Sequence, residues 1–122
     1  MKPFIIFAAI FMFIGVGAGA FGAHALADLL KSTGREGTFE TAVRYQMYHA
    51  LGLFAVAWLA QQHPSPWLNW AGWLLIIGVL IFSGSLYLLV FTGIRWLGAI
   101  TPIGGFAFLA GWLCVAIAAW RL

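Results

Sequence analysis

Four long apolar runs constrain the fold of this chain more than any other feature of its sequence. They cover about residues 4–26, 39–60, 68–91 and 97–120. Each is close to the ~20 residues that a helix needs to cross a hydrocarbon core about 30 Å thick. None alternates apolar and polar residues with a period of two, the pattern of a membrane-spanning strand. We therefore predict an all-α protein, with residues 1–122 forming a single domain that is an integral membrane bundle of four transmembrane helices.

The composition indicates that lipid is the main solvent of this bundle. Of the 122 residues, 64% are hydrophobic and only 7% are charged, whereas a soluble domain has about 25% charged residues. The net charge of +3 is small and scattered, which does not indicate nucleic acid and fits basic anchors at the membrane edges. We expect membrane lipids as partners, and nothing in the sequence indicates a cofactor. Lys2 and the apolar start also resemble a signal peptide, which we interpret as a retained first helix.

The longest connection, residues 28–40, is predicted to be a water-exposed loop. It contains all three acidic residues of the chain and is interrupted by Gly34 and Gly37. Thr38 is positioned to cap the second helix. The next connection, residues 61–67, contains two prolines and predicts a tight turn.

The basic residues give the predicted orientation. We call the face with both termini and the 61–67 turn side A, and the face with the 28–40 loop and the 93–96 turn side B. Side B carries four basic residues and side A two. By the positive-inside rule, side B and its 28–40 loop are then cytoplasmic. The basic residues of side B are Lys31, Arg35, Arg44 and Arg95, and those of side A are Lys2 and Arg121.

Polar side chains within the apolar runs gather in the half of the bundle nearer side B. Two interpretations are open: hydrogen bonds that join the helices, or a polar pocket for a ligand. Arg44 either reaches the interface and pairs with Glu40 or faces the bundle. The candidate ligand-binding cluster consists of His24, Arg44, Tyr45, His49, Ser83, Ser85, Tyr87 and Thr101.

The histidines allow structural, proton-relay, substrate-binding or metal-binding roles. No pair has the spacing of metal ligands, and neither a carboxylate nor the single Cys114 is expected at a matching depth. We therefore predict no metal site and assign no catalytic residue.

The sequence Thr101-Pro102 has two interpretations. Proline favours the first position of a helix and threonine the cap before it, so the fourth helix begins either at Pro102 or at Leu97 with a kink at the proline. In the first case the helix N-terminus, Arg44 and His24 would together form an anion site on side B.

Small residues recur four apart along the chain and allow close approach of helices in lipid. The close approach is either between helices of one chain or between subunits of a homo-oligomer. The pairs are Gly15 and Gly19, Ala18 and Gly22, and Ala107 and Gly111.

Several sequence blocks resemble a known family. GAFGAHAL at 19–26, RYQMYHAL at 44–51, FSGSLYLL at 82–89 and LGAITPIGG at 97–105, followed by GW at 111–112, are similar to the YgdD/YwdK group of small multi-pass membrane proteins, domain of unknown function four hundred and twenty-three. The resemblance runs over about residues 3–119. It implies a protein of the bacterial inner membrane and supplies no reaction. The family's recurring residues include Gln46 and Pro102 besides most of the cluster above.

Three classes of function remain open at this stage. The favoured class is a structural or accessory component of the membrane or of a larger membrane complex. The second is binding or transport of an anionic small molecule or lipid head group in a side B pocket. The third is a membrane enzyme that uses a histidine as acid or base.

Overall fold

The computed structural model describes residues 2–122, which fold into five helices with no strand among them. The prediction of an all-α protein is confirmed. The helices are α1 (Lys2–Ala23), α2 (Ala27–Thr33), α3 (Glu36–Gln62), α4 (Pro66–Thr92) and α5 (Leu97–Trp120).

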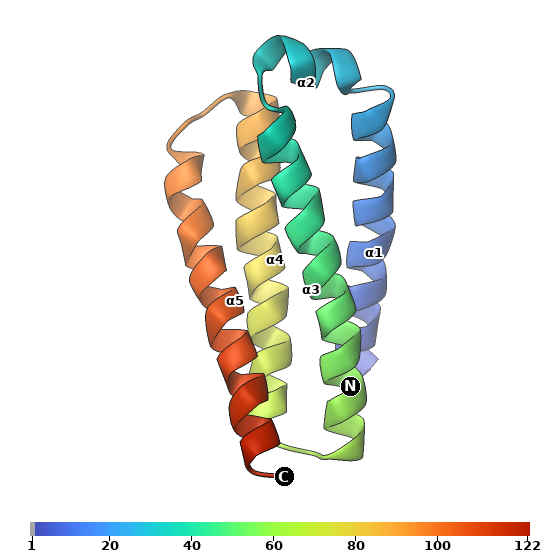
Figure 1. Cartoon of the computed structure of the whole chain (residues 1–122), viewed down its shortest axis with the longest axis vertical. Helices are drawn as coiled ribbons and strands as arrows, with labels where there is room; N and C mark the ends of the chain where they lie inside the picture. Colours follow the sequence, from blue (N-terminus) through green and yellow to red (C-terminus); the bar gives the residue numbers. More distant parts are fainter. Residues whose placement is uncertain (1) are drawn as a thin grey trace.

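Four of the helices form an elongated bundle, and the short α2 lies across one end of it (Figure 1). Contacts follow chain order, because α1 packs on α3, α3 on α4, and α4 most extensively on α5. Both termini lie at the end that has the α3–α4 turn, and α2 lies at the end of the α4–α5 connection (Figure 1). Sides A and B are therefore the two ends of the bundle.

Three helices, α1, α4 and α5, are long and apolar enough to cross a membrane. α3 has 27 residues, as many as α4, but it carries more polar residues than the other three. Large apolar side chains cover the outside of the bundle, as shown by the 82% exposure of Phe13 and the 71% exposure of Phe106. Lipid tails are the medium in which such a surface is stable.

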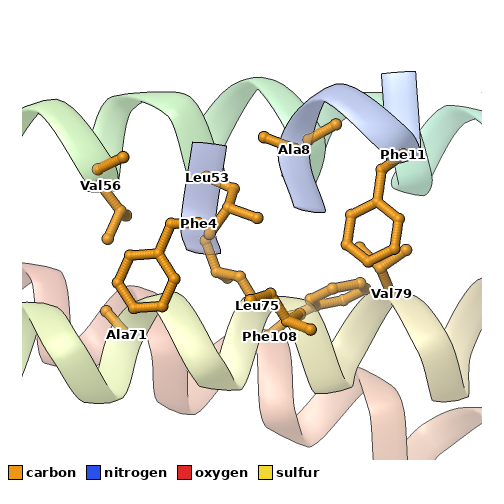
Figure 2. Close-up of a cluster of buried hydrophobic side chains, with 12 residues drawn as sticks. Phe4, Ala8, Phe11, Leu53, Val56, Ala71, Leu75, Val79 and Phe108 are labelled. Atoms are coloured by element: carbon orange, nitrogen blue, oxygen red, sulfur yellow. The ribbon is translucent and has the colours of Figure 1, made fainter. Parts of the chain in front are cut away.

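The apolar core lies where α1, α3 and α4 meet, and Phe108 of α5 also belongs to it (Figure 2). Phe4 is fully buried, with its ring against Gly72 of α4, where a Cβ would have no room. Leu53 and Leu75, from α3 and α4, are also fully buried. Because lipid is as apolar as these side chains, close packing and not transfer from water holds the helices together.

Glycines bring neighbouring helices of the same chain together. A Cβ on Gly22 would collide with the Phe39 ring of α3, and one on Gly111 would lie 3.0 Å from a methyl group of Leu75 in α4. A Cβ on Gly15 would likewise collide with the Met47 sulfur of α3. For these three glycines the interpretation as packing within one chain is confirmed.

The 28–40 segment differs from the predicted loop because it contains α2. Gly34 has a φ of 69°, and its N–H bonds to the Leu30 and Lys31 carbonyls, which ends α2. The chain then enters α3 at Glu36, with Arg35 in the capping position. Thr38 lies inside the helix, so its prediction as the cap is wrong. α1 ends at Ala23, earlier than expected.

α5 begins at Leu97 and continues through Pro102. The alternative in which the helix starts at the proline is wrong, and the anion site built on that N-terminus is wrong with it. At the other end of the bundle, Ser65 caps α4 by accepting a hydrogen bond from the Trp67 N–H at 3.2 Å, with Pro66 in the first turn.

Candidate functional site

Gln46 joins three helices at the centre of the polar region. It lies on α3 and is 3% exposed. Its side-chain nitrogen donates to the Phe11 carbonyl of α1 at 2.7 Å, and its oxygen accepts from the Tyr87 hydroxyl of α4 at 2.7 Å. The Phe11 carbonyl therefore receives a donor from outside its own helix. An amide that bonds on both sides is well suited to hold helices in register in lipid.

Two serines of α4 make the next interhelical bonds. The buried Ser83 hydroxyl donates to the Ala42 carbonyl of α3 at 2.7 Å. The Ser85 hydroxyl lies 2.6 Å from the Thr101 hydroxyl of α5. Ser83 therefore connects α4 to α3, and Ser85 connects α4 to α5.

His49 of α3 uses both ring nitrogens within the bundle. Its Nε2 accepts from the Trp112 indole N–H of α5 at 3.0 Å, and an indole nitrogen can only donate. The ring proton must therefore be on Nδ1, which donates to the Tyr45 carbonyl at 2.8 Å. The ring also stacks on Phe108, with centroids 3.6 Å apart and planes at 11°. Both nitrogens of this neutral imidazole are therefore hydrogen-bonded within the bundle.

The structure does not bring the predicted cluster into one pocket. His49, Ser83 and Ser85 are buried, and Tyr87 and Thr101 are half-buried. Tyr45 is exposed, with its ring against Phe82. His24, after the end of α1, and Arg44 are also exposed. Over residues 2–122, every buried side-chain nitrogen and oxygen has a hydrogen-bond partner.

Arg44 lines a groove of about 440 Å³ between α1, α2 and α3. We call it the side B groove. Its polar rim also includes Lys31, Glu36 and Glu40, and its apolar wall is formed by Gly19, Gly22, Ala23, Ala27, Leu30, Phe39 and Val43. Neither His24 nor Thr101 lines this groove. Arg44 and Thr101 therefore belong to different parts of the molecule, because Thr101 bonds to α4 from α5.

A second groove, of about 490 Å³, lies over the outer face of α3, α4 and α5. Its wall is nearly all aromatic or apolar, and His49 is part of it. Since both nitrogens of that ring are already bonded within the bundle, the groove presents few polar groups. Its lining is Tyr45, His49, Phe82, Pro102, Gly105, Phe106, Phe108, Leu109 and Trp112.

Arg35 and Trp112 make two interhelical hydrogen bonds that could not be foreseen from the sequence. The Arg35 guanidinium donates to the Val90 carbonyl at 2.9 Å, near the C-terminal end of α4, where a cation is favoured by the helix dipole. Trp112 stands out in the sequence only as part of a block that resembles the family, although its indole N–H needs an acceptor when it faces other helices. Gln46 stands out in the sequence only through the family resemblance. An uncharged amide in an apolar span is the signal that would have found it, because its amide requires partners.

The fold and composition define a small multi-pass membrane protein whose polar groups are inside and whose apolar surface faces lipid. A family model described as "Protein of unknown function (DUF423)" matches residues 18–105. The chain belongs to this family, which confirms the resemblance seen in the sequence blocks. No solved structure matches the chain.

Curated relatives match this chain over nearly its full length. The UPF0382 membrane protein SH2409 of Staphylococcus haemolyticus is 52% identical over 99% of this chain and 98% of its own. The UPF0382 membrane protein YwdK of Bacillus subtilis is 48% identical over 98% of this chain and 97% of its own. The UPF0382 inner membrane protein YgdD of Escherichia coli is 41% identical over 97% of this chain and 89% of its own. The predicted placement as a multi-pass protein of the bacterial inner membrane is confirmed.

Proposed function

We propose that this protein is a structural or accessory component of the bacterial inner membrane, crossing it four times. The observation that carries the proposal is the pairing of its interior polar groups. Gln46, Ser83 and His49 bond to backbone or side chains of neighbouring helices, and over residues 2–122 no buried side-chain nitrogen or oxygen lacks a hydrogen-bond partner. Such bonds define one arrangement of helices.

α3 is the fourth span in this proposal. Its charged residues are confined to its first three turns at side B, and residues 45–62 contain no charge. This stretch is about 27 Å long at 1.5 Å per residue, close to the thickness of the hydrocarbon core. Two of the polar residues in this stretch, Gln46 and His49, are buried against other helices, and Gln61 and Gln62 lie at its side A end. Lipid therefore meets a surface more apolar than the composition of α3 suggests.

Extraction of the tagged full-length chain with its surrounding lipid, in polymer-bounded membrane particles, tests the accessory role. We expect the chain in a complex of fixed stoichiometry with itself or another membrane protein, measured by mass photometry and quantitative mass spectrometry of the particles. A chain that is monomeric and alone in these particles at native expression levels would contradict the accessory role.

A second candidate function, binding or transport of an anionic small molecule or lipid head group, is favoured by the side B groove. Arg44 and Lys31 face this groove from two different helices. Native mass spectrometry from gentle detergent, comparing the wild type with Arg44→Ala, tests it. A retained small molecule that is lost in the variant supports binding. Bare protein of identical stoichiometry in both samples contradicts it and leaves Arg44 as an interface anchor.

A further inference from the structure

The side B groove combines an apolar wall with a charged rim at the membrane surface. α2 lies across the end of the bundle at this level (Figure 1), and the groove opens between α2, α1 and α3. Its volume of about 440 Å³ is within the range of small-molecule sites. Because the groove is at the end of the spans, a lipid head group reaches its rim from the bilayer without crossing the hydrocarbon core.

The rim carries two positive and two negative side chains. Glu36, Glu40 and Arg44 are spaced four apart, so they lie on one face of α3, and Lys31 faces them from α2. A purely anionic ligand would meet the two carboxylates as well as the two cations. A ligand with one charge of each sign satisfies both pairs, since the phosphate accepts from Arg44 and Lys31 and an ammonium group donates to the glutamates.

The charged ends of these side chains are free for such a ligand. All four residues are exposed, and none of their side chains takes part in the side-chain hydrogen bonds found within residues 2–122. The neighbouring Arg35 differs from them, because its guanidinium donates to the Val90 carbonyl. The rim is therefore charged, accessible and not consumed by the fold.

The wall of the groove suits the glycerol and upper acyl chain of a lipid. Gly19 of α1 leaves space there, because a Cβ added to it would make only an ordinary contact, 3.8 Å from Val43. Leu30 and Phe39 are buried at the base of the same groove. A lipid anchored by its head group would lay its apolar part along this wall.

We infer that the side B groove binds a zwitterionic phospholipid whose head group carries a primary ammonium, as in phosphatidylethanolamine. This deepens the second candidate function and is independent of the accessory role. The ammonium is the discriminating group. Three N–H donors bond directly to carboxylates, whereas the methylated ammonium of phosphatidylcholine has none.

The experiment is a native mass spectrometric titration of the full-length protein in gentle detergent with phosphatidylethanolamine, phosphatidylcholine or phosphatidylglycerol. We expect phosphatidylethanolamine to be retained about tenfold better than the other two, the size of one charge-assisted hydrogen bond. Arg44→Ala is expected to reduce its retention by a similar factor. Glu40→Gln is expected to remove the preference over phosphatidylcholine. Arg95→Ala, an exposed arginine of side B outside the groove, is the matched control and should bind as the wild type does.

A second variant tests the groove without changing its charge, so the inference stays testable if Arg44→Ala does not fold. Gly19→Leu fills the wall and should abolish retention, whereas Gly84→Leu, at a position with open space around its Cβ, should not. Circular dichroism and thermal unfolding check that each variant is folded. Excess soluble phosphoethanolamine should leave the bound lipid in place. Displacement of the lipid by this excess would show a soluble ligand and overturn the lipid assignment.

Two further outcomes separate this inference from the second candidate function. Equal or better retention of phosphatidylglycerol, with a gain from Glu40→Gln, would overturn the inference and leave a general anion site in place. Absence of any retained lipid in the wild type, with Gly19→Leu indistinguishable from it, would overturn the inference and the lipid-binding form of the second candidate function together.

Discussion

At the scale of single residues, the interior of this membrane protein depends on side chains that satisfy one another. Gln46 bonds to α1 and α4 together, and His49 receives the Trp112 N–H from α5. In hydrocarbon an unpaired donor or acceptor is costly. Each partner therefore keeps the other in place, and removal of one group affects two helices.

Tyr87→Phe removes the hydroxyl that donates to Gln46 and leaves the Gln46 oxygen without that donor. We expect a loss of about 1 kcal/mol in the free energy of unfolding, in line with interhelical hydrogen bonds in membranes. Reversible unfolding in mixed micelles measures it. Tyr48→Phe is the matched control, because it also removes a tyrosine hydroxyl, but from a position of α3 that is 57% exposed. It should leave the free energy of unfolding unchanged. Equal stability of both variants would contradict a structural role for the bond.

The His49 tautomer is a second prediction at this scale. Because Nε2 accepts from Trp112, the proton is expected on Nδ1. The ¹⁵N chemical shifts of labelled histidine, assigned with His49→Gln, distinguish the two tautomers. A protonated Nε2 would place two N–H donors opposite each other and would contradict the Trp112 bond. His24, which is exposed, should show the shifts of a solvated ring in the same spectrum.

At the scale of helices, α4 and α5 are held together by close backbone contact. Gly104 is buried, and a Cβ on it would lie 2.8 Å from the Phe82 Cα and closer still to its backbone nitrogen. A backbone cannot move aside as a flexible side chain can, so this contact sets how near the two helices approach. Pro102, two residues earlier, is accommodated within α5.

Gly104→Ala is therefore expected to separate α4 and α5 and to lower the free energy of unfolding by about 2 kcal/mol or more, as overpacked cores do. Gly84→Ala, on α4 with nothing within 4 Å of the added Cβ, is the control. It should be neutral or stabilising by up to about 1 kcal/mol, because alanine favours helix. The same unfolding assay serves both variants. Similar effects at the two glycines would show that the close approach does not limit packing.

The helices could largely be predicted from the sequence, and their partners could not. Apolar runs of the length of a span identified α1, α4 and α5, and the bounds predicted for α5 hold. α2 was missed because a seven-residue helix in a polar segment has no apolar period to detect. Depth along each helix correctly placed Ser85 and Thr101 near one another. It could not show that Arg44 faces α1 and α2 while Thr101 faces α4, because the faces in contact depend on tertiary packing.

At the scale of the whole molecule, α3 directs its most polar central side chains toward neighbouring helices and leaves apolar side chains such as Leu51 and Trp58 exposed. It packs between α1 and α4, and its buried Gln46 and His49 are bonded to other helices. This arrangement explains why α3 lacks the composition of a span and why we nevertheless propose that it crosses the membrane. The four-span arrangement is the central claim of our account.

Cysteine accessibility across the membrane tests this claim most directly. In a Cys114→Ala background, which removes the only cysteine, Ser32→Cys and His63→Cys place a thiol in exposed segments just before and just after α3. We expect a membrane-impermeant maleimide to label position 63 in intact spheroplasts and position 32 only after permeabilisation, as the orientation from the basic residues predicts. Labelling of both positions from the same side would show that α3 does not cross the membrane and would contradict the four-span bundle.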